Sequence, residues 1–350
     1  MDLIDFYKNK RVFITGHTGF KGSWLCKILI KSGAIVTGYA LEPPTDPSLF
    51  NIAGISEGLN SIIGDIRDFE FLNKIFNNSE PEIVIHLAAQ PIVKASYQLP
   101  RYTYETNVMG TVNILECIRK SDTTKSFINV TTDKVYENKE WLWGYREDDK
   151  LNGFDPYSNS KSCSDLVTQC YGNSFFTEGR VAISTVRAGN VIGGGDFAPN
   201  RILPDCVRSA ISNQDIIIRN PYSVRPYQHV LESLFAYLLI AEKQYSNPDF
   251  AGNYNVGPDD QDCYQTSKLV DIFINKWGGG ISWINKHDGG PHEANLLKLD
   301  CSKLKSIFGW KPTWNLEKSI EKTVEWTKVW IKGEDIGEIM NKQIYGFLNK

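Results

Sequence analysis

A glycine-rich turn near the start of the chain constrains the fold more than any other feature. Residues 11–14 carry β-branched and aromatic side chains, as expected of a buried strand, and Gly16, Gly19 and Gly22 follow at intervals of three. A helical spacing of apolar residues then continues to Gly33, where a second strand pattern begins. This order predicts a βαβ unit, in which the two strands are parallel.

The alternation of strands and helices continues to about residue 188. Further strands are expected at 60–63, 82–87, 126–130 and 182–187, and helices at 69–76, 107–119 and 157–171. The strand at 82–87 is apolar almost throughout, as expected when helices cover both faces of a parallel sheet. We therefore predict an α/β fold, a Rossmann-type doubly wound parallel sheet with a smaller C-terminal substrate-binding lobe.

The regular alternation ends after Gly189, where three consecutive glycines and several prolines follow. We predict a dinucleotide-binding Rossmann domain over residues 1–188 and a substrate lobe over residues 189–350. A helical pattern at 231–244 is expected to return to the first domain, as part of a segment of about 228–258.

Composition and charge exclude several classes of partner. The net charge is −3 and the basic residues are scattered, so no nucleic-acid surface is expected. The longest apolar stretch, residues 234–241, is too short to cross a membrane. Seven cysteines without C-x-x-C spacing indicate reduced thiols and a cytoplasmic protein, and five histidines without ligand spacing predict no metal site.

The glycine turn predicts a dinucleotide site. Glycines let the backbone approach a pyrophosphate, which binds at a helix N-terminus. Glu42 stands near the position of an acid that binds ribose, and no Arg or Lys lies between Ala40 and Asn60, which favours NAD over NADP. The expected cofactor contacts are Gly16, His17, Thr18, Gly19, Phe20, Lys21, Gly22, Asp65, Ile66, Leu87, Ala88, Ala89 and Asn107.

Two further segments contain candidate catalytic residues. Tyr157 and Lys161 are four residues apart, so on a helix they share a face, and a lysine ammonium favours a tyrosine phenolate. A phenolate can take the proton of an alcohol while a nicotinamide takes the hydride. Thr132, Asp133 and Lys134 follow an expected strand and add an acid and an amine, which simple alcohol oxidation does not need.

Several motifs, in order along most of the chain, carry a family resemblance. They are residues 15–25, Thr132 to Tyr136, the Tyr157/Lys161 pair, residues 187–196, residues 225–231 and His292-Glu293-Ala294. In these motifs the chain resembles the nucleotide-sugar dehydratases and epimerases of the extended short-chain dehydrogenase/reductase superfamily. Among these enzymes it is most similar to the CDP-glucose 4,6-dehydratase family.

This resemblance implies a cleft between a cofactor domain and a sugar-nucleotide domain, and a homodimer or tetramer. It implies bound NAD and the redox-neutral conversion of CDP-D-glucose to CDP-4-keto-6-deoxy-D-glucose plus water. The product feeds deoxysugar and O-antigen synthesis in that family.

The resemblance also implies roles for the catalytic residues. Tyr157 takes the 4-hydroxyl proton, and Lys161 lowers the tyrosine pKa and holds the nicotinamide ribose. Thr132 binds the 4-oxygen, and Asp133 is the acid at the 6-hydroxyl. Lys134 replaces a glutamate of the related dTDP-glucose dehydratases, so it is either the base at carbon 5 or a charged stabiliser of the enolate.

Arginines suit a diphosphate because they bind it with two parallel hydrogen bonds, which draws attention to Arg187, Arg201 and Arg225. The expected substrate contacts are Gln90, Lys94, Asn190, Arg201, Arg225, His229 and His292. His292 and Glu293 either touch the nucleotide ribose or are structural.

Three alternatives stay open. A nucleotide-sugar 4-epimerase would use Tyr157 and Lys161 but has no work for Asp133 and Lys134, and a dehydratase could act on another nucleoside-diphosphate sugar. A catalytically silent dinucleotide-binding regulator is a third reading, against which the intact catalytic set argues.

Overall fold

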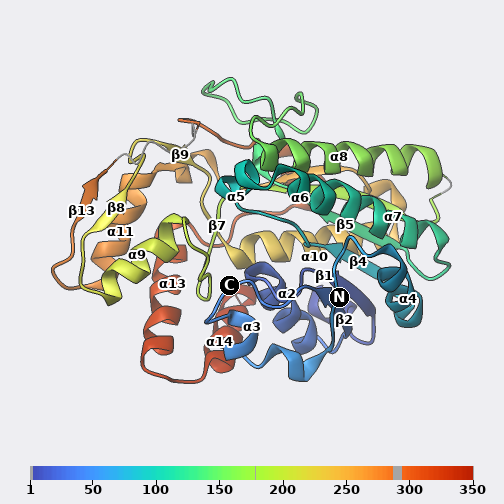
Figure 1. Ribbon diagram of the computed structural model, residues 1–350, viewed down its shortest axis with the longest axis horizontal. Coiled ribbons are helices and arrows are strands. Elements are labelled where there is room, and N and C mark those ends of the chain that lie inside the picture. Colours follow the sequence, from blue (N-terminus) through green and yellow to red (C-terminus); the bar gives the residue numbers. More distant parts are fainter. Residues whose placement is uncertain (1–2, 178, 287–293, 350) are drawn as a thin grey trace.

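A parallel sheet of seven strands forms the centre of the protein in the computed structural model, which describes residues 3–177, 179–286 and 294–349 (Figure 1). In spatial order the strands are β11 (Asn253–Val256), β6 (Ala182–Ala188), β5 (Ser126–Val130), β4 (Ile83–His86), β1 (Arg11–Thr15), β2 (Ile35–Ala40) and β3 (Asn60–Ile63). All six pairings are parallel, and the order reverses direction at β1 and β4. The predicted Rossmann-type doubly wound sheet is therefore confirmed.

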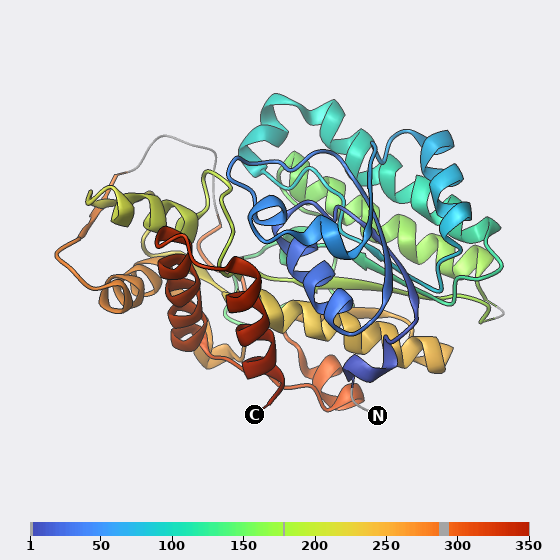
Figure 2. The same cartoon turned by 90° about the horizontal axis from the view of Figure 1, so that it is seen from below.

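Helices cover both faces of this sheet. One face packs against α4 (Phe69–Ser79), α7 (Gly110–Lys120) and α8 (Pro156–Phe175), and the other against α2 (Phe20–Lys31) and α10 (Val230–Ser246) (Figures 1 and 2). The short helices α1 (Leu3–Phe6), α3 (Leu49–Ile52), α5 (Val93–Gln98) and α6 (Pro100–Tyr104) lie around these layers. A π-helical turn over Glu105–Met109 joins α6 to α7, so the helix expected from residue 107 begins irregularly.

A second hydrophobic core forms the smaller lobe. It contains α9 (Ile202–Ile211), α11 (Thr266–Trp277), α13 (Leu316–Ile331) and the paired strands β8 (Ile216–Ile218) and β13 (Trp283–Asn285). Two further pairs border it, β7 (Val191–Ile192) with β10 (Gln228–His229), and β9 (Val224–Arg225) with β12 (Tyr264–Gln265).

The C-terminal segment is shared between the two cores. Helix α10 packs on β5 and β6, and β11 extends the main sheet beside β6, in the segment expected to return. Helices α12 (Ser302–Phe308) and α14 (Ile336–Leu348) also contribute to the large core, where α14 packs against α2. An apolar helical stripe in the sequence does not reveal which of two cores it will cover.

No described helix is long and apolar enough to cross a membrane. The described residues likewise form no cluster of His, Cys, Asp or Glu suited to a metal ion.

Candidate active site

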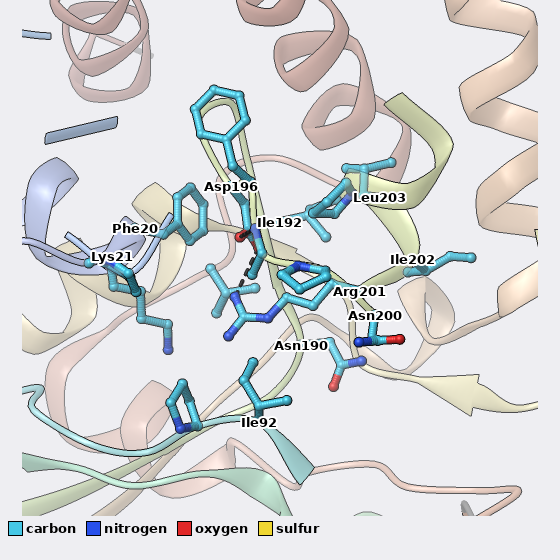
Figure 3. A pocket seen from close by; sticks show the side chains of 18 of the residues that line it. Phe20, Lys21, Ile92, Asn190, Ile192, Asp196, Asn200, Arg201, Ile202 and Leu203 are labelled. Atoms are coloured by element: carbon cyan, nitrogen blue, oxygen red, sulfur yellow. Dashed lines mark hydrogen bonds and ion pairs between the residues drawn. The ribbon is translucent and has the colours of Figure 1, made fainter. Parts of the chain in front are cut away.

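A cavity of 1190 Å³ lies at the carboxyl ends of the central strands and extends to the smaller lobe. Its walls include the glycine turn after β1, the segments after β2, β4 and β5, and residues of β9 and α9. In open α/β sheets, ligands bind at this edge, beside the point where strand order reverses. Figure 3 shows Lys21 and Arg201 reaching into the same part of this cavity from opposite lobes.

The glycine turn is shaped by close backbone packing. Gly16 has a φ of 76°, and a Cβ there would lie 2.7 Å from the amide nitrogen of Ala88. A Cβ on Gly22 would lie 2.2 Å from the carbonyl oxygen of Gly16. The first turn of α2 has no side-chain cap at Gly19, so its amides remain for a ligand. Uncapped amides at a helix N-terminus suit a pyrophosphate, so the site fits a dinucleotide.

Tyr157 and Lys161 lie on one face of the first turns of α8. Asp155 starts this helix by accepting from Ser158 N at 3.0 Å, and Pro156 occupies its first position. The Lys161 ammonium donates to the carbonyl oxygen of Val130 at 2.7 Å, which ties the helix to the end of β5. Both residues line the cavity.

Burial dominates the titration of this pair. It raises the pKa of Tyr157 to about 12, against which a hydrogen bond with Thr132 and the charge of Arg201 act. The sequence predicts that Lys161 lowers the pKa of Tyr157. In the structure, the groups that lower it are Thr132 and Arg201. Burial also lowers the pKa of Lys161 to about 8, and the carboxylate of Asp165 partly offsets this.

The segment after β5 brings an acid and an amine beside the pair. The Thr132 hydroxyl donates to Asp133 Oδ1 at 2.9 Å, while Asp133 Oδ2 is buried with no hydrogen-bond partner among the described residues. Burial raises the pKa of Asp133, and the charge of Lys134 acts against this rise. A carboxyl that keeps its proton more readily than usual is suited to general-acid catalysis.

Lys134 lines the cavity next to this acid. Its backbone amide donates to Thr132 Oγ1 at 3.4 Å, which closes a short turn. Within the described chain, its ammonium forms no hydrogen bond or ion pair, so it is available to a bound ligand.

Lys21 brings a second, partly buried amine to the cavity. It donates to the Tyr237 hydroxyl at 3.2 Å, and burial, with the charges of Arg201 and Lys161, lowers the pKa of Lys21 to about 7. Asp65, at the end of the cavity expected to hold adenosine, is bound by Arg67 at 2.6 Å.

Three side chains of the substrate set define the wall from the smaller lobe. Arg201 precedes α9 and pairs with Asp196 at 2.9 Å, as the dashed line in Figure 3 marks. Arg225 donates to the carbonyl oxygens of Val224, at 3.0 Å, and Ala294. Asn190 lines the same wall.

Two predicted substrate residues lie on the opposite wall. Lys94 lines the cavity at the start of α5. Gln90 also lines it, but its amide already bonds to Ile92 and Thr103 and so shapes the loop.

Most of the predicted residues meet in the cavity, and three do not. His17 lies beneath the glycine turn, with Nε2 2.7 Å from Ser61 Oγ. Asn107 holds the backbone of Gln90 through its Oδ1 and Nδ2 atoms. His229 accepts from the amide of Leu231 at the start of α10.

These three positions are corrections to the predicted site, because each side chain is buried against protein and not against the cavity. The rings of Trp24 and Trp314 pack around His229. The predicted His292, with Glu293, lies outside the described residues.

Arg187 is a further correction. It is fully buried in β6 and pairs with Asp165 at 2.9 Å, so it does not face a diphosphate. Asp165 was not among the predicted site residues, although it follows Lys161 at the four-residue spacing that relates Lys161 to Tyr157. Other cavity residues that the sequence gave no signal for come largely from irregular segments, namely Thr45, Ser48, Tyr102, Asn200, Tyr222, Ser223 and Asn295.

The sheet, the uncapped glycine turn and the Tyr157/Lys161 pair define a protein of the extended short-chain dehydrogenase/reductase class. The chain belongs to the GDP-mannose 4,6 dehydratase family, whose model matches residues 13–323. It is 48% identical to the CDP-glucose 4,6-dehydratase of Salmonella typhimurium, over 99% of this chain and 98% of that protein. These matches confirm the resemblance found in the motifs.

More distant relatives share the fold. The dTDP-glucose 4,6-dehydratase of Salmonella typhimurium is 26% identical over 88% of this chain and 90% of that protein. The crystal structure of the Bacillus anthracis dTDP-glucose 4,6-dehydratase in complex with NAD superimposes with a TM-score of 0.77 at 21% identity, covering 92% of this chain and 98% of that one. A UDP-glucose 4-epimerase complex with NAD from Thermus thermophilus gives 0.79 at 23%, covering 91% and 98%.

Proposed function

We propose that the protein is an NAD-dependent CDP-D-glucose 4,6-dehydratase, which forms CDP-4-keto-6-deoxy-D-glucose and water. One observation carries this proposal: a pair suited to oxidation, Tyr157 and Lys161, and a pair suited to elimination, Asp133 and Lys134, line the same cavity. The 48% identity to the Salmonella enzyme over nearly the whole chain supports the same substrate.

NAD fits the cavity through the backbone of the glycine turn. Gly16, Gly19 and the uncapped first turn of α2 would hold its pyrophosphate, and Lys161 its nicotinamide ribose. Glu42 lines the cavity, and residues 41–59 contain no Arg or Lys for a 2′-phosphate, which favours NAD over NADP. Bound there, the cofactor supplies reversible hydride transfer, which side chains cannot perform.

The side chains move the protons of the oxidation. Tyr157 accepts the proton of the sugar 4-hydroxyl, and Thr132 holds the 4-oxygen by a hydrogen bond. Because burial raises the pKa of Tyr157, the phenolate depends on two groups that favour the anion: the Thr132 hydroxyl, once it turns from Asp133 Oδ1, and the Arg201 guanidinium.

The elimination uses the neighbouring pair. Asp133 gives its proton to the departing 6-hydroxyl, which its raised pKa assists. Lys134 faces carbon 5 in one of two roles, as a neutral amine that removes the proton or as an ammonium that stabilises the enolate. Arg201 and Arg225 bind the diphosphate, and Asn190, Gln90 and Lys94 line the sugar site.

A panel of nucleoside-diphosphate glucoses tests this function. The protein, supplied with NAD, should convert CDP-glucose to a 4-keto-6-deoxy sugar much faster than the dTDP, UDP or GDP compounds. NADH should not accumulate, because the hydride returns to carbon 6. Inversion at carbon 4 without loss of water would identify an epimerase, and stoichiometric NADH release would identify a simple dehydrogenase.

The setting of the enzyme follows from the same proposal. We expect a cytoplasmic homodimer or tetramer that supplies a deoxysugar for O-antigen synthesis. Light scattering coupled to gel filtration measures the assembly, and deletion of the gene in its host measures the effect on surface polysaccharide.

A further inference from the structure

A fully buried ion pair lies behind the catalytic residues. Arg187 on β6 donates through Nε and Nη2 to the two carboxylate oxygens of Asp165 on α8, each at 2.9 Å. Both side chains are 0% exposed, and neither lines the cavity. The two parallel hydrogen bonds fix the relative position of the two side chains.

The catalytic turn, defined as residues 131–136, is attached to this ion pair at both ends. At its start, the Thr131 hydroxyl donates to Asp165 Oδ2 at 3.1 Å. At its end, Arg187 Nη1 donates to the Tyr136 hydroxyl at 2.9 Å. Thr132, Asp133 and Lys134 lie between these two attachments.

The same pair belongs to the helix that carries the oxidising residues. Tyr157, Lys161 and Asp165 follow one another at intervals of four and share a face of α8. The Lys161 ammonium binds Val130 O, one residue before Thr131. Helix α8 therefore holds the end of β5 at two consecutive residues.

The remaining polar atoms of the pair are also bound. Thr185 and Gln169 donate to Asp165 Oδ1 at 3.2 and 2.8 Å, and Arg187 Nη1 also donates to the carbonyl oxygen of Glu147 at 2.7 Å. Replacing a buried ion pair by apolar side chains of similar volume is often neutral or stabilising. Stability alone is therefore a weak reason for two charges at this place.

We propose that Asp165 and Arg187 are positioning residues, which hold the catalytic turn in the register that sets Thr132, Asp133 and Lys134 opposite Tyr157. The inference rests on the proposed function. It predicts that losing the pair impairs chemistry while leaving the binding of substrate and cofactor intact.

The double variant Asp165→Leu/Arg187→Met tests this without leaving an unpaired buried charge. We expect it to fold with a lower denaturation midpoint, because Gln169, Thr185 and the Glu147 carbonyl lose a buried partner, and its KM for CDP-glucose to change less than about threefold. Its kcat should fall by about 100-fold, the loss associated with a displacement of about 1 Å in an active site. A folded double variant with the wild-type kcat would overturn the proposal.

Two single variants form a matched pair. Thr131→Val removes an attachment of the catalytic turn to Asp165, whereas Gln169→Leu removes a hydrogen bond to the same carboxylate from outside the turn. We expect kcat to fall at least tenfold in the first and to stay within twofold in the second. Equal effects would mean that the carboxylate acts through stability alone.

Hydrogen exchange gives a readout that does not depend on turnover. Amides of the catalytic turn should exchange at least tenfold faster in the double variant than in the wild type, and at the wild-type rate in Gln169→Leu. Unchanged exchange in the double variant would refute the positioning role even if no sugar nucleotide proved to be a substrate. A wild-type protein that converts none of the glucose compounds would refute only the proposed function.

Discussion

His86 should remain neutral far below the usual pH of histidine titration. Thr15 Oγ1 accepts from the amides of Leu87 and Ala88, both at 3.2 Å, so its proton is left to donate to His86 Nδ1 at 2.6 Å. On the other side of the ring, Thr111 donates to the carbonyl of Asn107 and thus accepts from His86 Nε2 at 3.2 Å. The ring is held as the neutral Nε2–H tautomer, because a proton on Nδ1 would face a donor.

The magnitude follows from the titration of this ring. Burial and, second, the charge of Lys161 lower the pKa of His86 from 6.5 to about 3. At 1.36 kcal/mol per pKa unit, this shift corresponds to about 5 kcal/mol of stability. Since the folded-state pKa is depressed, that stability is complete above pH 6.5, declines as the pH falls, and is fully lost below about pH 3. Between these limits the free energy of unfolding should rise with pH.

Two measurements check this. In NMR spectra of histidine-labelled protein, the His86 ring should not titrate between pH 8 and pH 5. In urea unfolding, His86→Gln should reduce the slope of stability against pH by about 1.4 kcal/mol per unit between pH 6 and pH 4. The comparison variant His17→Gln should reduce the slope of stability against pH over a narrower pH interval, because the pKa of His17 is lowered only to about 4. A His86 midpoint near pH 6.5 would refute the reasoning.

Four further variants test the site. Tyr157→Phe should lower kcat at least about 1,000-fold while calorimetry shows nearly unchanged nucleotide-sugar binding. Near-normal turnover would show that another group accepts the proton of the 4-hydroxyl. Lys134→Met should permit hydride transfer but slow exchange of the carbon-5 hydrogen with solvent deuterium, and exchange at the wild-type rate would exclude this lysine as the base. Arg225→Lys should raise the KM for CDP-glucose more than it lowers kcat, because it loses the two-pronged guanidinium; an unchanged KM would assign the diphosphate to other residues. Gly22→Ala should weaken NAD binding at least tenfold in a titration, since its Cβ would meet Gly16 O at 2.2 Å, and unchanged affinity would show that the turn can shift harmlessly.

The main sheet was predictable because its central strands carry their own signal. Ile83–His86 and Ser126–Val130 are buried on both faces, so each reads as a strand without reference to its neighbours. Strand β11 gives a weaker signal, because Asn253 and Asn255 alternate with two apolar residues and are bound only through contacts with distant parts of the chain. Such a strand depends on β6, which precedes it by about 65 residues.

The candidate site likewise contains residues that local sequence predicts and residues that it does not. The glycine turn and the Tyr157/Lys161 pair depend on spacing within one turn or helix, which a sequence displays directly. Three predicted residues lie in or beside site motifs but do not line the cavity, namely His17, Asn107 and His229. Their orientation depends on their partners, which are Ser61, Gln90 and Leu231 in turn. The shifted titration of Tyr157 arises from burial between two lobes, which no local pattern encodes.

The late arrival of β11 has a consequence for synthesis on the ribosome. Strand β6 is complete at Ala188, but its outer edge stays unpaired until Asn253–Val256 has emerged. At about 5–20 residues per second, the nascent chain exposes this edge for several seconds. An open edge can pair with another chain, so β6 is available for such pairing during that interval, and once Val256 is in place the sheet ends at β11 instead. Expression at a lower temperature slows translation and so prolongs that interval. A chaperone that binds exposed strand edges protects the nascent chain during it.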